Sequence, residues 1–218
     1  MNLAALFDPT AASIVVGGTA LATFLRCGTT NCRLVATSLA QLGRKHFDAQ
    51  GTKAELAVQV REIQQDGLLR ASPHHFADRE FDEATDALIG RRSVTALLAA
   101  HESHKARRLA ASNRAASTLA QASELAPVFG LAATLISLSQ LPADGIARGA
   151  YASAIGLAVM ATLYGLLLAN LLLAPLARVI ERAAAAEERE RQSIVDWLAA
   201  QVAPAIPRTR PAPLDHAA

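Results

Sequence analysis

Three runs without a charged side chain dominate this sequence, and they limit it to folds that suit a membrane. The runs cover residues 11–25, 125–141 and 150–176. A helix over the last run would be about 40 Å long, and one over the middle run about 26 Å. The hydrocarbon core of a bilayer is about 30 Å thick. The first run, at about 22 Å, spans only with its flanking residues or a locally thinned bilayer. The runs therefore predict three transmembrane helices.

The composition supports a helical membrane protein. Hydrophobic residues make up 52% of the chain but aromatic residues only 4%, and charged residues 18%. This balance argues against a disordered chain, a disulfide scaffold and an all-β fold. The net charge of +2 is too small to indicate a nucleic-acid partner. We predict an all-α integral membrane protein with three transmembrane helices and a helical cytoplasmic region, in which long helices continue from the last two spans.

The basic residues predict the orientation of the chain. Fourteen of the 21 lie between the first two runs, one (Arg148) lies in the connection between the last two, and six follow the last run. The positive-inside rule then places residues 26–124 and the C-terminus in the cytoplasm, and the N-terminus and the 142–148 connection outside. The predicted regions are 1–25 (N-terminal segment and first span), 26–124 (cytoplasmic helical region), 125–176 (transmembrane hairpin forming the channel), 177–203 (cytoplasmic C-terminal helix) and 204–218 (disordered tail).

Helix boundaries in the water-facing parts follow from glycine, proline and charge. A basic, leucine-spaced helix is expected to continue from the first span over residues 26–47, with a break at Gly51 and Thr52. Further helices are expected over 53–69 and, after a stop at 72–73, over the acidic stretch 76–89, ended by Gly90. One long helix is predicted from 93 to 141, and the last span is predicted to run on to about residue 201. We expect His101 and His104 to be solvated.

The spans carry no Asp, Glu, Lys, Arg or His, so an enzyme working in the membrane or a self-sufficient proton relay is not indicated. Small and hydroxylated residues instead form stripes at helical spacing. Such stripes permit close helix packing, or they line a pore, and the spacing alone leaves both interpretations open. Pro127 and Pro175, near the predicted cytoplasmic ends of two spans, can act as hinges or as fixed kinks. The stripes are Gly130, Ala133, Thr134 and Ser137 in the second run, and Thr162, Gly165 and Ala169 in the third.

These residues resemble the MotA/TolQ/ExbB proton-channel family, and its MotA members in particular. Ala126-Pro127-Val128-Phe129-Gly130, with Thr134 four residues later, is similar to the family's third-span motif. Gly17, Gly18 and Thr19 are similar to the second MotA span. The resemblance covers about residues 10–200. The residues similar to the fourth span are Thr162, Tyr164, Gly165, Ala169, Asn170, Pro175 and Leu176.

The resemblance implies an ion-conducting stator subunit of the bacterial flagellar motor in the inner membrane, and not an enzyme. Such subunits form a homopentamer around a MotB-like single-span partner, which supplies the ion-binding Asp. Proton or sodium flow is coupled to torque on a flagellar rotor protein, and neither a cofactor nor a metal is expected. The implied channel-lining residues are Thr134, Ser137, Thr162, Gly130 and Ala133, and the implied coupling residues are Pro127 and Pro175.

Two departures from the family pattern keep alternatives open. The pattern of the first MotA span is not found, so we expect either a three-span layout like that of TolQ or ExbB, or a start site that was chosen too late. In the rotor-facing stretch Gly67-Leu68-Leu69 matches, but Gln64 and Ser72 stand where the family has a base and an acid. The alternatives are a TolQ/ExbB-type energiser of envelope transport and a non-conducting structural membrane protein. The residues expected to contact the rotor instead are Arg61, Asp66, Arg70, Asp82 and Glu83.

Overall fold

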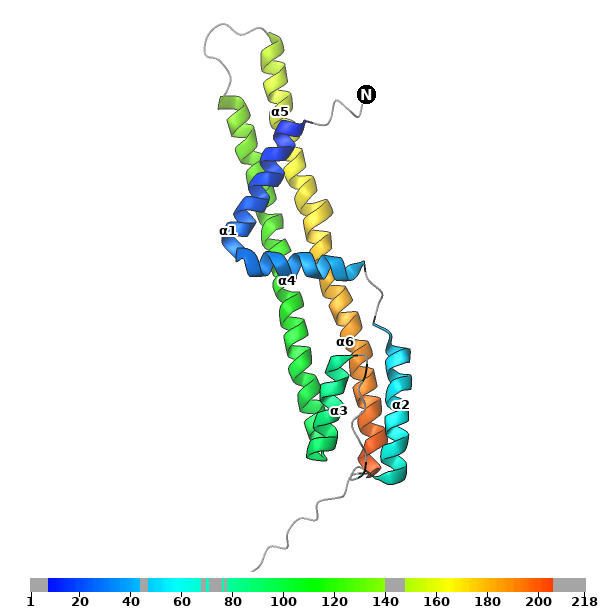
Figure 1. Cartoon of the computed structure of the whole chain (residues 1–218). Helices are drawn as coiled ribbons and strands as arrows, with labels where there is room; N and C mark the ends of the chain where they lie inside the picture. The colour runs from blue at the N-terminus through cyan, green and yellow to red at the C-terminus, as the bar shows by residue number, and fades with distance from the viewer. Residues whose placement is uncertain are drawn as a thin grey trace, which may run out of the picture. The chain divides into compact units, whose positions relative to one another are not determined.

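The protein is all-α, as predicted. The computed structural model describes residues 8–43, 47–67, 70, 76, 78–139 and 148–205, and no strand occurs among them. Figure 1 shows the helices in chain order. They are α1 (Pro9–Leu42), α2 (Ala49–Asp66), α3 (Arg79–Arg91), α4 (Val94–Ser139), α5 (Arg148–Leu167), the π-helix η2 (Leu168–Leu173), α6 (Ala174–Val202) and the short 3-10 turn η3 (Ala203–Ala205).

The helices group into two compact units. The first consists of Met1–Lys45 and Leu109–Ala184, and the second of His46–Arg108 and Ala185–Ala218. Both α4 and α6 therefore contribute residues to each unit.

Within the part of the chain that the structure describes, three helical stretches are long and apolar enough to cross a membrane: Pro9–Leu42, Val94–Ser139 and Ala154–Ala205. The first contains the whole of one uncharged run, and each of the other two contains most of one. The two long helices expected to continue from the last two spans are confirmed, because α4 has 46 residues and α5 leads through η2 directly into α6. Large apolar side chains such as Leu135 (67% exposed) and Leu171 (75% exposed) cover the outside of these helices. Such a surface suits lipid or another apolar partner better than water.

Helix α1 is divided at Gly28. Asp8 caps its start, where a side-chain oxygen accepts a hydrogen bond from the Thr10 amide at 2.8 Å. Gly28 has φ 76° and ψ 169°, a conformation open essentially to glycine alone. The chain changes direction there (Figure 1). The prediction of one uninterrupted helix from the first span through residue 47 is therefore wrong: the helix breaks at Gly28 and ends at Leu42.

The first unit is held together by small apolar side chains. Val15 of α1 is fully buried in a cluster with Ala133 of α4 and Ala161 of α5. Beyond Gly28, the second half of α1 packs Leu34, Val35 and Leu39 against the alanines of α4 and against Ile180 of α6. The backbone N–H of Asp8 also donates a hydrogen bond to the hydroxyl of Tyr164 at 2.9 Å. Both halves of α1 are thus anchored within this unit.

The second unit has a larger aliphatic core built from α2, α3 and the parts of α4 and α6 that belong to it. Its most deeply buried side chains include Leu56, Leu88, Leu97 and Leu198, each at most 1% exposed. Burial of each such leucine contributes roughly 1.5–3 kcal/mol. This core fixes where α3 lies on α4 and α6.

Capping aspartates shift two of the predicted boundaries. α2 begins at Ala49, before the predicted break, because Asp48 accepts a hydrogen bond from the Gly51 amide at 2.9 Å. Gly51 and Thr52 therefore lie in the first turn of the helix. Asp78 caps α3 in the same way through the Glu80 amide. α3 also continues past Gly90, and Arg92 in the left-handed region ends it.

Some sequence predictions fall outside the described residues. These are the stop at 72–73, the connection over 142–147 and the tail from 206 onward.

Candidate functional site in the α4–α5 helix pair

Helices α4 and α5 pack closely at two buried glycines, Gly130 and Gly165. A β-carbon added to Gly130 would lie 3.4 Å from the Cα of Gly165 and 3.0 Å from the carbonyl oxygen of Ala161. A β-carbon on Gly165 would lie 2.7 Å from the Ala126 carbonyl oxygen. Any side chain here would hold the two backbones apart. This is the close backbone packing that small residues permit in membrane helices.

Two threonine hydroxyls lie beside this crossing. The Cα of Thr162 would be 3.4 Å from a β-carbon on Gly130, and Thr134 lies one helical turn further along α4. Both side chains are half-buried. Thr134 donates its hydroxyl proton to the carbonyl of Leu131 at 2.6 Å, and Thr162 donates to the carbonyl of Ala158 at 3.2 Å. With their protons committed, both oxygens keep lone pairs that can accept from a protonated group or coordinate a cation.

The other predicted lining residues lie at different depths in the packing. Ala133 is only 1% exposed and packs against α1 and α5, and Gly130 is also buried. Ser137 is half-buried and donates to the carbonyl of Ala133 at 2.8 Å. Of the predicted stripe on α4, Thr134 and Ser137 are therefore the members that remain partly exposed on this chain.

The polar side chains of this region are hydroxyls and one amide, that of Asn170. Between residues 125 and 139 and between 149 and 176 the sequence has no acid, histidine or lysine. Among the described residues, no group of three His, Cys, Asp or Glu side chains could hold a metal ion. The site can solvate a cation or accept a hydrogen bond, but the proton-binding group would have to come from elsewhere.

The two predicted hinge prolines lie in different helical settings. Pro127 is half-buried within α4, and its Cα would be 3.2 Å from a β-carbon on Gly165. Pro175 is exposed and lies two residues after the end of the π-helix, whose C-cap residue Ala174 donates its N–H to the carbonyl of Ala169, five residues back. Because Pro175 has no N–H to donate to the carbonyl four residues back, the wider π turn relieves the clash at this point. A hinge role for either proline stays a prediction.

The residues expected to contact a rotor lie in the second unit. Arg61 and Arg70 are exposed, and Asp66 is the last residue of α2. Asp82 accepts from the Phe76 amide at 3.3 Å. Glu83 is exposed but pairs with Arg79 at 2.8 Å and with His104 at 3.1 Å. The two acids of α3 are thus already engaged within the chain.

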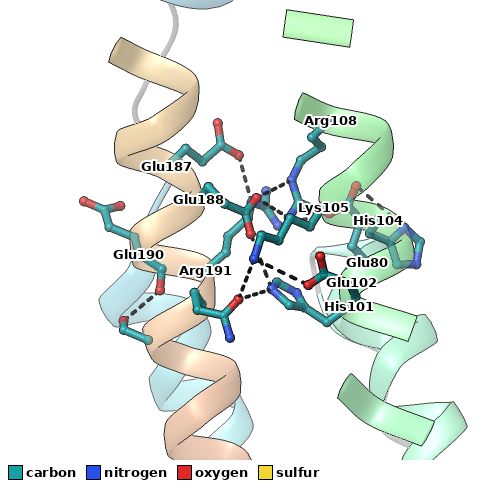
Figure 2. Close-up of polar contacts among 12 residues, drawn as sticks. Glu80, His101, Glu102, His104, Lys105, Arg108, Glu187, Glu188, Glu190 and Arg191 are labelled. Carbon is teal, nitrogen blue, oxygen red and sulfur yellow. Dashed lines mark hydrogen bonds and ion pairs between the residues drawn. The ribbon is translucent and has the colours of Figure 1, made fainter. Parts of the chain in front are cut away.

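A buried ionic cluster in the second unit was not predicted. Arg108 of α4 pairs with Glu188 of α6 at 2.7 Å and with Glu80 of α3 (Figure 2). Arg191 of α6 pairs with Asp78 at 2.7 Å and lies over the ring of Phe47, 4.2 Å from its centroid.

The expectation that His101 and His104 are solvated is wrong. The two residues are 6% and 8% exposed, because α3 and α6 cover that face of α4. One feature of the sequence could have indicated this burial. His101, His104 and Arg108 are spaced three and four residues apart, so they lie on the same face of helix α4.

The comparisons with known proteins agree with the spans and with the helix pair. A family model described as the MotA/TolQ/ExbB proton channel family matches residues 71–193, more than half of the chain. No curated protein matches the sequence.

Two solved structures are similar over nearly the whole chain. The structure of C. jejuni MotAB gives a TM-score of 0.79 at 17% identity, covering 94% of this chain and 82% of that chain. The flagellar MotAB stator complex from Bacillus subtilis gives 0.81 at 19% identity, covering 93% and 81%. At these identities the likeness shows a shared fold.

Proposed function

The chain belongs to the MotA/TolQ/ExbB proton channel family, and from this premise we propose that it is the ion-conducting stator subunit of a bacterial flagellar motor. Three apolar helices and the family make it a multi-pass protein of the inner membrane. The orientation that we propose has the N-terminus outside and the C-terminus in the cytoplasm, since 20 of its 21 basic residues then lie inside.

The observation that carries the proposal is a pair of threonine oxygens beside the point where α4 and α5 pack closely at Gly130 and Gly165. The membrane segments around this point contain no Asp or Glu. Thr134 and Thr162 present lone pairs, while their protons are held by the helix backbone. A carboxylate from another chain could exchange its proton or ion against these oxygens. We propose that a MotB-like single-span partner supplies that Asp, and the two similar structures are of MotAB complexes.

The remaining parts of the pathway follow from their positions on the helices. Thr134, Thr162 and Ser137 are proposed to line it, with Gly130 and Ala133 holding α4 close to its neighbours. Pro127 and Pro175 are proposed to let the helices bend as the ion passes. The assembly proposed is a homopentamer around the partner, and the proposed rotor contacts are Arg61, Asp66, Arg70, Asp82 and Glu83.

Isosteric replacement of the threonines tests the pathway. Thr162→Val and Thr134→Val each remove one oxygen and are expected to lower ion flux about 5- to 10-fold, the cost of one hydrogen bond. Flux is measured in vesicles that contain the chain and its partner, and swimming is scored alongside. Thr23→Val is the matched control, because Thr23 is on α1 and donates in the same way to the carbonyl of Thr19, one turn back, at 2.7 Å. Normal membrane insertion is required of all three variants.

The outcomes separate the candidate functions. Unchanged flux in both pathway variants would remove the threonines from the ion path. A complete lack of proton and sodium current with the partner present would favour a structural membrane protein. A partner that carries a TonB-type domain, and not a peptidoglycan-binding domain, would identify an energiser of envelope transport.

A further inference from the structure

His104 lies at the meeting point of α3 and α4 with a different charged group at each ring nitrogen. Its Nε2 lies 3.1 Å from a carboxylate oxygen of Glu83. Its Nδ1 lies 2.7 Å from an Nη atom of Arg107 and 3.8 Å from a carboxylate oxygen of Glu80. The residue is only 8% exposed, so water cannot readily replace these partners.

The contact with Arg107 assigns the protonation state of the ring. A guanidinium has five N–H donors and no acceptor. At 2.7 Å it can only donate, so Nδ1 must present its lone pair and the ring proton must be on Nε2, where it points to Glu83. The described contacts of His104 are therefore those of a neutral imidazole.

Adding a second proton to the ring would exchange its partners. A protonated Nδ1 can no longer accept from Arg107, and it would bring a second positive charge against that guanidinium. The nearest acceptor for the new N–H is the Glu80 oxygen at 3.8 Å. The other oxygen of Glu80 is held in place by Arg108 and lies 3.6 Å from Arg191, so this carboxylate stays beside the ring.

We propose that His104 is a pH-operated switch between α4 and α3. While the ring is neutral, it accepts from Arg107 of its own helix and donates to Glu83. When the cytoplasm acidifies, the ring releases Arg107 to solvent and bonds to Glu80 and Glu83 together, both on α3. Imidazole is the side chain suited to such a change between pH 5 and 8. The proposal concerns the second unit and does not depend on ion flux.

His101, one helical turn before His104, provides a matched control. Its Nε2 faces two acceptors, Gln192 at 3.3 Å and Glu188 at 3.4 Å, both on α6. This nitrogen donates whether the ring is neutral or charged, so no partner exchange is required there. The residue is similarly buried, at 6% exposed.

Hydrogen exchange of the α3 amides in the full-length chain in nanodiscs tests the switch. After correction for intrinsic exchange rates, amides of Arg79–Arg91 are expected to exchange about 2- to 5-fold more slowly at pH 5.5 than at pH 8, the range for one added ion pair. His104→Gln can accept from Arg107 and donate to Glu83 but cannot gain a proton, so it should abolish the pH effect. His101→Gln should retain it.

Three results would overturn the proposal: no pH effect in the wild type, a full effect in His104→Gln, or loss of the effect in His101→Gln. If His104→Gln is poorly protected at both pH values, nitrogen-15 spectra of ring-labelled wild-type protein decide. The Nδ1 of His104 must be unprotonated at pH 8 and protonated at pH 5.5. A ring that is protonated at Nδ1 already at pH 8 contradicts the switch.

Discussion

Gly130 and Gly165 lie opposite each other where α4 packs on α5, and the Cα of each would be in close contact with a β-carbon placed on the other. A β-carbon on Gly130 would be 3.4 Å from the Cα of Gly165, and one on Gly165 would be 3.2 Å from the Cα of Gly130. Backbone atoms, which cannot rotate away, surround both positions. The pair therefore sets the distance between the two helices beside Thr162.

Replacing Gly165 by alanine should separate the helices. The new methyl group would lie 2.7 Å from the Ala126 carbonyl oxygen, so we expect a loss of about 1–3 kcal/mol of stability, the usual cost of overpacking. The thermal unfolding midpoint of the chain in nanodiscs measures this. Gly156→Ala on the same helix is the control, because its methyl group meets nothing within 4 Å. Equal midpoints for the two variants would refute the close crossing.

Neighbouring glycines of α1 offer a second matched comparison. A β-carbon on Gly18 would overlap the ring of Phe129, whereas one on Gly17 meets nothing within 4 Å. We expect Gly18→Ala to lower stability by about 1 kcal/mol, because the ring must move, and Gly17→Ala to leave stability unchanged or to raise it by up to about 1 kcal/mol. Thermal unfolding in nanodiscs again checks the pair. A larger loss at Gly17 would show that α1 presents a different face to α4.

The sequence predicted the spans well because their signal is local. The length of an uncharged run alone indicates whether a helix can cross the bilayer. The structure has long helices at the last two runs, in α4 and in the stretch from α5 to α6. The break at Gly28 was missed because a single glycine inside a helical pattern is compatible with a continuous helix. Its positive φ becomes evident only from the packing of Leu34 and Leu39 beyond it, which involves residues about 80 to 140 positions later in the chain.

The Gly28 backbone makes a strong prediction of its own. Gly28→Ala would place a β-carbon in a conformation reserved for glycine and should cost about 1–3 kcal/mol, although the surrounding space is open. Gly90→Ala is the control, since Gly90 is helical and has similar open space, and alanine should stabilise it by about 0.5–1 kcal/mol. Chemical or thermal denaturation distinguishes the two signs. A stabilising Gly28→Ala would mean that α1 is straight.

Arg108 is predicted to be the most sensitive ionic residue of the second unit. Arg108→Gln removes the guanidinium that pairs with both Glu188 and Glu80. The side chain of Glu188 is only 10% exposed, so water cannot fully replace this contact. We expect the free energy of opening α3 to fall by about 2–4 kcal/mol, because a half-broken buried pair is costly. Hydrogen exchange of the α3 amides measures it. Arg79→Gln, at an exposed pair on the same helix, should change little.

Pro175 is predicted to maintain the π-helix that precedes it. Pro175→Ala supplies an N–H that can donate to Leu171 and complete an ordinary α-helical ladder. We expect the five-residue bond from Ala174 to Ala169 to be replaced by four-residue bonds, which alters the rotation of α6 relative to α5. A structure of the variant tests this directly. A π-helix that persists without the proline would have another cause, such as the packing around Ala169.

The candidate site was predictable in part. Thr134 and Thr162 were selected from their spacing and from a motif, and both lie beside the crossing with partly exposed hydroxyls. How deeply Ala133 is buried could not be predicted, because that depends on α1, which approaches from the far end of the sequence. The prediction for His101 and His104 was wrong for the same reason. Helices α3 and α6 bury these side chains, and the local sequence of α4 does not show which helices pack against it.

The bend in α1 also defines the length of its first helical segment. From Pro9 to the residue before Gly28 the helix extends about 28 Å, close to the 30 Å of a hydrocarbon core, and Asp8 caps its first turn. The distance between the polar cap at Asp8 and the bend at Gly28 is thus close to the thickness of one hydrocarbon core. Beyond the corner the chain leaves the line of the span and carries the exposed Arg33. Adding or removing one helical turn between Asp8 and Gly28 would move either the polar cap or the bend relative to the surface of the bilayer. The length of this helix is therefore constrained more tightly than its composition.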